Sequence, residues 1–178
     1  MGDQNIDGGT VEGFGEEWAT YDQSVRSEAD LRQTFDRYFS VFPWDALPAG
    51  ARGFDAGCGS GRWAVLAAPR VGQLVAVDPA ERALEVATGA LEGAPNAQTV
   101  RGAAGSLPLR DRSMDFGYSL GVLHHTPDPA VGMADCVRCL KPGAPFLVYL
   151  YYALDDRPAW FRAVWKASVR MTENGLSE

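Results

Sequence analysis

Cysteine and histidine are scarce in this 178-residue chain, and features that would direct it to a membrane or to nucleic acid are missing. The three cysteines are odd in number and lack the spacing of a disulfide framework, which points to a reducing compartment. No apolar run is long enough to span a bilayer, and the polar start does not resemble a signal peptide. The net charge of −7 argues against a nucleic-acid-binding surface. We therefore expect a cytoplasmic location and no nucleic-acid partner.

The length and composition fit one globular domain with flanking segments. Hydrophobic residues make up 46% of the chain, which is enough for one core, and 178 residues are too few for two comfortable domains. Residues 1–13 are polar and rich in glycine, and we expect a loose lead-in there. We expect N-terminal helices over 14–48, the main domain over 49–152, and a C-terminal helix within 153–178.

Strand and helix patterns alternate from residue 28 onward. Short apolar runs predict strands, and apolar residues at helical spacing predict helices. The strands are expected over 53–56, 74–77, 98–101, 115–120 and 145–152, and the helices over 28–42, 61–68, 80–91 and 130–140. Strands joined by such helices form right-handed βαβ units. The pattern therefore predicts an α/β protein with a sheet of mainly parallel strands.

The helix expected over 130–140 contains two of the three cysteines. Cys136 and Cys139 have no second ligand pair nearby, so we expect a buried stripe and no metal site. Helical spacing predicts that the inward-facing residues include Val131, Ala134, Val137 and Leu140.

A glycine-rich turn over 55–62 follows the first strand, where a parallel sheet presents its ligand crevice. Its glycines allow a tight turn and a close ligand, and backbone N–H groups are expected to point outward at the start of the next helix. The third glycine, Gly61, comes one residue too early for a dinucleotide fingerprint, and the Lys-Ser/Thr of a P-loop is absent. The leading carboxylate, Asp55, would repel a pyrophosphate but favour an ammonium or sulfonium. A turn that merely connects two elements is the alternative.

The second strand ends in an acid, Asp78, followed by Pro79. An acid some twenty residues after the glycine turn is placed to accept hydrogen bonds from two ribose hydroxyls. The alternative is that Asp78 caps the next helix, with Pro79 at its first position. Both roles are compatible. If the ribose contact is the main role, removing this side chain should leave folding nearly intact.

Five segments together resemble the class I S-adenosylmethionine-dependent methyltransferases. Within that class the chain is similar to the small-molecule branch that has the methyltransferase-11 type domain. The resemblance covers residues 50–152 in order and spacing, and 14–18 resembles the lead-in helix of bacterial members. The segments that carry it are 54–62, 76–79, 102–108, 114–127 and 140–143.

The resemblance implies S-adenosyl-L-methionine as cofactor and assigns a part of it to each segment. Asp55 and the turn with Gly57, Cys58, Gly59 and Gly61 would hold the methionine end. Asp78 would hold the ribose with Pro79 against the adenine, Ala103 and Ala104 would flank the adenine, and Ser119 and Leu120 would border the sulfonium. Relatives usually have an acid at position 103. Because this chain has alanine, adenine must be recognised by backbone or by Gly105 and Ser106, and affinity is expected to be lower.

The implied reaction is methyl transfer to a small-molecule acceptor, for which no catalytic residue is assigned. The two histidines, His124 and His125, could supply a base. We favour a packed loop in which one ring lies near the cofactor and the other is solvated. A non-catalytic cofactor-binding module, or a fragment of a larger methyltransferase, is the alternative function. A nicotinamide-dependent oxidoreductase is disfavoured by the glycine spacing and Asp55.

The resemblance also implies a Rossmann-like, doubly wound sheet with the strand order 3-2-1-4-5, followed by two further strands. The stretch after residue 152 has the pattern of a two-faced helix and no strand, so we expect a truncated enzyme. A membrane surface is a less favoured partner for that helix. Trp18 and Tyr21 are either a lid over the cofactor or packing residues of the first helix. The oligomeric state is left open.

Overall fold

The computed structural model describes residues 5, 6, 9, 27–150 and 158. Its centre is a five-stranded, all-parallel sheet in the order β3-β2-β1-β4-β5. The strands are β1 (Arg52–Ala56), β2 (Gln73–Asp78), β3 (Ala97–Arg101), β4 (Phe116–Leu120) and β5 (Phe146–Tyr149). This confirms the predicted Rossmann-like sheet and its strand order. Every strand lies within about two residues of its predicted start.

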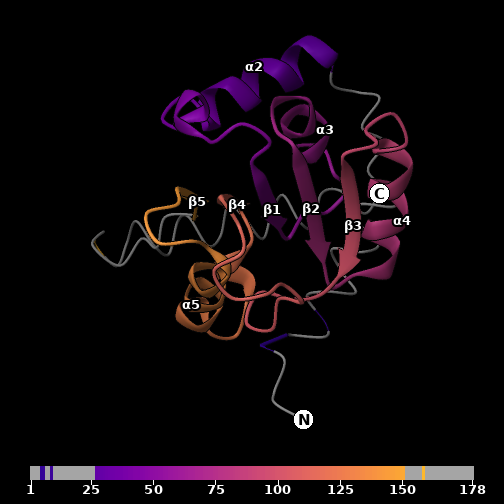
Figure 1. Ribbon diagram of the computed structural model, residues 1–178. Coiled ribbons are helices and arrows are strands. Elements are labelled where there is room, and N and C mark those ends of the chain that lie inside the picture. The colour runs from indigo at the N-terminus through magenta and orange to yellow at the C-terminus, as the bar shows by residue number, and fades with distance from the viewer. Residues whose placement is uncertain (1–4, 7–8, 10–26, 151–157, 159–178) are drawn as a thin grey trace, which may run out of the picture.

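Helices cover both faces of the sheet, as a doubly wound fold requires (Figure 1). The helices are α2 (Glu28–Tyr38), α3 (Ala64–Ala67), α4 (Glu81–Ala90) and α5 (Pro129–Cys139), with short 3₁₀ turns at Trp44–Ala46, Ala68–Arg70 and Leu123–His125. The first three helices contribute to one hydrophobic cluster, and α5 packs in a second cluster on the opposite face. Of the helices described, none has the length and apolarity needed to cross a membrane.

The N-terminal helix α2 begins at the expected residue and adds an aromatic layer to the fold. Ser27 caps it by accepting a hydrogen bond from the N–H of Asp30. Phe35 and Phe39 are buried, and the ring of Phe39 meets that of Tyr118 in β4 at a centroid distance of 5.1 Å. The predicted lead-in over 1–13 is described only at three residues. Trp18, Tyr21 and, apart from Pro158, the predicted C-terminal helix lie outside the described residues.

Two sequence predictions about helices are wrong. The helix expected from Gly61 begins only at Ala64, because Gly61 has a φ of +78° that a right-handed helix excludes. In α5, Val131 and Val137 are 45% and 54% exposed, and Ala134 is exposed too. The buried residues of α5 are Gly132, Cys136 and Cys139, with Leu140 just beyond its end. Gly132 allows close packing, since a Cβ there would lie 3.1 Å from Leu123. The expected buried cysteine stripe is confirmed.

Two glycines make room for aromatic rings between the neighbouring strands β1 and β4. Gly53 pairs with Phe116, and Phe54 pairs with Gly117. A Cβ at Gly117 would lie 2.4 Å from the ring of Phe54, and a Cβ at Gly53 would lie 2.2 Å from the ring of Phe116. Both rings are fully buried, so neither can move without displacing the core.

Gly117→Ala is therefore expected to lower the free energy of unfolding by about 1–3 kcal/mol, the usual cost of overpacking a core. The control is Gly89→Ala in α4, where a Cβ meets nothing within 4 Å. That change should instead stabilise the protein by about 0.5–1 kcal/mol, because alanine favours helix over glycine. Urea denaturation measures the free energy of unfolding of both variants. Equal stability of the two variants would contradict the packing described for β1 and β4.

Candidate functional site: a buried carboxyl at the carboxyl edge of the sheet

The loops that follow β1, β2 and β3 meet at the carboxyl edge of the sheet through backbone hydrogen bonds. The N–H groups of Gly57 and Cys58 donate to the carbonyl of Val77 at 2.8 and 3.0 Å. The N–H of Gly102 donates to the carbonyl of Asp78 at 3.1 Å. These bonds bring the glycine turn, the end of β2 and the start of the loop after β3 into one place. The predicted site residues on these three segments are thus neighbours.

Asp55 is the central group, because it is an acid that the fold buries. It is 1% exposed near the end of β1 and pairs in register with Tyr118 of β4. Within the described residues, neither Asp55 Oδ2 nor the Tyr118 hydroxyl has a hydrogen-bond partner. A buried carboxylate without a partner is costly, so this position favours either a protonated acid or a ligand with a positive charge.

Burial raises the pKa of Asp55 to about 8. The nearby Tyr118 hydroxyl and Arg62 lower this pKa, and Asp78 raises it, but none of them outweighs burial. The ligand-free group is therefore protonated at neutral pH. As the pH rises from the usual aspartate range to about 8, the unfolded chain ionises first and the fold loses stability.

The glycine turn needs glycine for conformation and for space. Gly57, Gly59 and Gly61 all have positive φ, at +79°, +53° and +78°. A Cβ at Gly57 would also lie 2.4 Å from the side chain of Val122, so the turn packs closely against the segment that follows β4. Cys58 is buried within the turn, and burial raises its pKa far above the ordinary range, which keeps its thiol neutral.

The N–H groups of Gly57, Cys58 and Gly59 are used within the protein and are not available to a ligand. The first two donate to Val77, and the N–H of Gly59 donates to Asp78 Oδ2 at 2.9 Å. No described residue donates to the carbonyl of Gly57. The carbonyl of Gly57, two residues after Asp55, is therefore left as an acceptor, and carbonyl and carboxyl oxygens suit an ammonium better than an anion.

Asp78 lies at the end of β2 with 8% exposure, and both of its oxygens accept backbone hydrogen bonds. Oδ2 accepts from Gly59 and Oδ1 accepts from the N–H of Ala80, each at 2.9 Å. Burial raises its pKa, and these two bonds counteract the rise. The predicted helix cap is wrong in detail, because α4 begins at Glu81 with Ala80 as N-cap and Pro79 lies outside it. A carboxylate has about four acceptor positions, so capacity for ribose hydroxyls is left.

The remaining predicted residues lie on the loop after β3 and at the end of β4. Ala103 and Ala104 are buried, at 5% and 7% exposure. Ser119 is fully buried and its hydroxyl donates to the carbonyl of Ala56 at 2.8 Å, so it ties β4 to β1. Leu120 is 8% exposed. Contact of these residues with a cofactor stays a prediction.

The two histidines form a close pair in the 3₁₀ turn after β4. Their ring centroids are 3.9 Å apart, and both residues are half-buried. Burial and the neighbouring His125 lower the pKa of His124. His124 is therefore largely neutral at pH 7. No metal-binding group of His, Cys, Asp or Glu occurs among the described residues.

Sequence reasoning missed three features of this site. The pairing of Tyr118 with Asp55 could be found only from the strand register. The backbone bonds of Asp78 depend on the shape of the glycine turn. The hydrogen bond from Asn5 to the carbonyl of Ala104 joins residues 99 positions apart, and no local pattern marks it.

Asp78→Ala is expected to destabilise the fold, contrary to the expectation from sequence. The change leaves the N–H groups of Gly59 and Ala80 without their acceptor, at about 1–3 kcal/mol for each buried unsatisfied group. Asp78→Asn keeps one acceptor oxygen and should lie between wild type and Asp78→Ala. The control is Asp45→Ala, because Asp45 is exposed. Denaturant unfolding measures all three, and a wild-type stability of Asp78→Ala would show that these bonds are unimportant.

Comparison with known protein families matches residues 54–148 to the methyltransferase domain family. The uncharacterized methyltransferase YcgJ of Bacillus subtilis is 32% identical over 107 residues, which cover 59% of this chain and 42% of the relative. Demethylmenaquinone methyltransferase of Staphylococcus aureus is 33% identical over 98 residues, which cover 53% of this chain and 40% of the relative. The chain thus spans less than half the length of these curated relatives.

Solved structures agree with the family match. The crystal structure of YcgJ from Bacillus subtilis superposes with a TM-score of 0.60 at 27% identity, covering 71% of this chain and 52% of that chain. The [4+2]-cyclase SpnF matches in fold alone, with a TM-score of 0.55 at 23% identity over 63% of this chain and 42% of that chain. The family match spans more than half of the present chain, with the buried Asp55, the glycine turn and Asp78 inside it. The chain belongs to the methyltransferase domain family.

Proposed function

We propose that this chain binds S-adenosyl-L-methionine at the carboxyl edge of the sheet and transfers its methyl group to a small-molecule acceptor. The observation that carries the proposal is the buried carboxyl of Asp55, whose Oδ2 has no partner among the described residues. An ammonium at this oxygen would supply the missing charge. The cofactor provides a methyl group on a sulfonium, which leaves as a neutral thioether when an acceptor nucleophile takes the methyl.

The residues present fit such a ligand. Asp55 and the carbonyl of Gly57 provide acceptors for the ammonium of the methionine end. Asp78 keeps acceptor capacity for ribose hydroxyls at the end of β2. The N–H groups of Ala103 and Ala104 donate no hydrogen bond within the described residues, so they are free to recognise the ring nitrogens of adenine. These residues bind and orient the cofactor, and alignment with the acceptor is the main contribution required of the protein.

The same features disfavour a nicotinamide dinucleotide. The turn uses the N–H groups of Gly57, Cys58 and Gly59 internally and presents a carboxyl and a carbonyl instead. A pyrophosphate needs N–H donors and a site free of carboxylates. A small-molecule acceptor is supported by a relative that is named for a small molecule, demethylmenaquinone. The neutral His124 could accept a proton where the acceptor carries one.

Calorimetric titration of the purified chain tests the proposal. We expect S-adenosyl-L-methionine and S-adenosylhomocysteine to bind, because both carry the ammonium, ribose and adenine that the site fits. NAD should give no binding heat. Asp55→Asn should weaken both adenosyl ligands by roughly tenfold or more, because a hydrogen bond to a charged group contributes about 1.5–3 kcal/mol. Binding of NAD without binding of either adenosyl ligand would contradict the proposed function.

A further inference from the structure

The loop that follows β3 is held in place by side chains from two distant parts of the chain. It runs over residues 102–109 and includes Ala103 and Ala104, whose N–H groups donate no hydrogen bond to any described residue. Because position 103 has no acidic side chain, recognition of adenine depends on the backbone of this loop. The affinity of a backbone site depends on how firmly its conformation is fixed before the ligand arrives.

One peptide group of this loop is held on both sides. Asn5 Nδ2 donates to the carbonyl of Ala104 at 3.1 Å, and the N–H of Gly105 donates to Asp135 Oδ2 at 3.0 Å. These two bonds fix the orientation of the peptide plane between Ala104 and Gly105. Gly105 has a φ of +115°, a conformation that other residues rarely adopt. The two hydrogen bonds therefore stabilise an uncommon backbone conformation.

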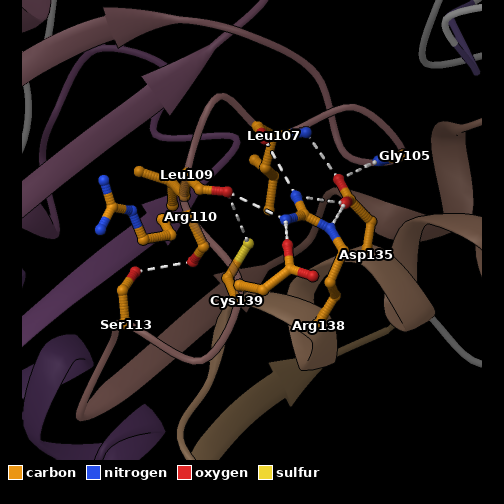
Figure 2. A network of polar contacts seen from close by, with 9 residues as sticks. Gly105, Leu107, Leu109, Arg110, Ser113, Asp135, Arg138 and Cys139 are labelled. Carbon is orange, nitrogen blue, oxygen red and sulfur yellow. Dashed lines mark hydrogen bonds and ion pairs between the residues drawn. The ribbon is translucent and has the colours of Figure 1, made fainter.

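Helix α5 holds the next part of the loop through an ion pair (Figure 2). Asp135 Oδ2 also accepts from the N–H of Leu107 at 2.6 Å. Arg138 donates to the carbonyls of Leu107 and Leu109 at 3.0 and 2.9 Å, and its Nε donates to Asp135 Oδ1 at 2.8 Å. The Asp135 side chain is only 9% exposed, so this pair is shielded from water more than an ordinary surface salt bridge.

Asn5 connects the loop to the start of the same helix. Its Nδ2 also donates to the carbonyl of Asp128 at 2.9 Å, and its Oδ1 accepts from the N–H of Asp128 at 2.8 Å. Asp128 in turn caps α5 by accepting hydrogen bonds from Ala130 and Val131. The loop, Asn5 and both ends of α5 are therefore joined in one closed network.

We propose that Asn5, Asp135 and Arg138 are positioning residues that hold the loop after β3 in the conformation that recognises adenine. The inference rests on the proposed function, because it concerns the same cofactor site. None of the three residues needs to touch the ligand. They act by raising the fraction of molecules whose loop is ready to bind, and the apparent affinity falls in proportion when that fraction falls.

The test compares S-adenosylhomocysteine with S-inosylhomocysteine in the full 178-residue chain. Adenine N1 accepts a hydrogen bond, whereas hypoxanthine N1 carries a hydrogen and opposes a backbone N–H donor. We expect wild type to prefer the adenosyl ligand by roughly tenfold or more, the effect of one unpaired polar contact. Asp135→Asn and Arg138→Met should weaken the adenosyl ligand by roughly fivefold or more and the inosyl ligand less, so that the preference shrinks.

Asn5→Gly is the variant that separates positioning from folding. Asn5 has a φ of +45°, which glycine adopts without strain, and the change removes only the side-chain bonds. It should reduce the preference for adenine with little change in melting temperature. The control is Asp111→Asn, which removes an ion pair of Arg138 but none of its bonds to the loop backbone, and it should keep the wild-type preference.

Two results would overturn the inference in different ways. If wild type prefers the adenosyl ligand and all three variants keep that preference while only their stability falls, the network is purely structural. If wild type binds neither ligand, the proposed function fails, and the inference fails with it. A reduced preference in Asn5→Gly at unchanged stability supports the positioning role.

Discussion

The constraint on which the site depends is the burial of one carboxyl group, Asp55, at the end of the central strand. Its neighbours are a parallel sheet, a turn of glycines and the hydroxyl of Tyr118, and the positive charge of nearby Arg62 lowers its pKa too little to outweigh burial. Without a ligand the group avoids the cost of a buried charge by keeping its proton. When a cationic ligand binds, the ionised carboxylate of Asp55 attracts it strongly, because water is excluded from the site. The burial of Asp55 weakens the ligand-free fold, and the binding of a cationic ligand explains why it is there.

The rest of the edge is organised around that carboxyl. Asp78 closes the glycine turn through Gly59, so the second acid is structural as well as available to a ligand. Because the turn consumes its own N–H donors, it presents carbonyl and carboxyl oxygens, and this preference distinguishes it from the related turns that bind pyrophosphate. The fold alone does not fix the activity, since a cyclase shares it. The acceptor groups at the carboxyl edge of the sheet are what favour a cationic ligand.

The sequence was a good guide to the sheet and a poorer one to its surroundings. Strands β1 and β2 were predictable because they are short apolar runs that end in turn signals and an acid. The buried face of α5 was not, because Val131 and Val137 also recur at helical spacing and only the tertiary contacts of Gly132 and Asp135 select the other stripe. The positive φ of Gly61, the backbone partners of Asp78 and the contacts of Asn5 all depend on three-dimensional proximity that no local pattern records.

The central claim is that a cationic ligand displaces the proton of Asp55, and proton release on binding measures this directly. Calorimetric titration with S-adenosylhomocysteine at about pH 6.5, in buffers that differ in ionisation enthalpy, counts the protons exchanged. Because burial raises the pKa of Asp55 to about 8, the free protein holds the proton at this pH, whereas the α-amino group of the ligand is already charged. We predict the release of close to one proton by wild type and of none by Asp55→Asn. Binding without proton release in wild type, or the same release in Asp55→Asn, would contradict the account.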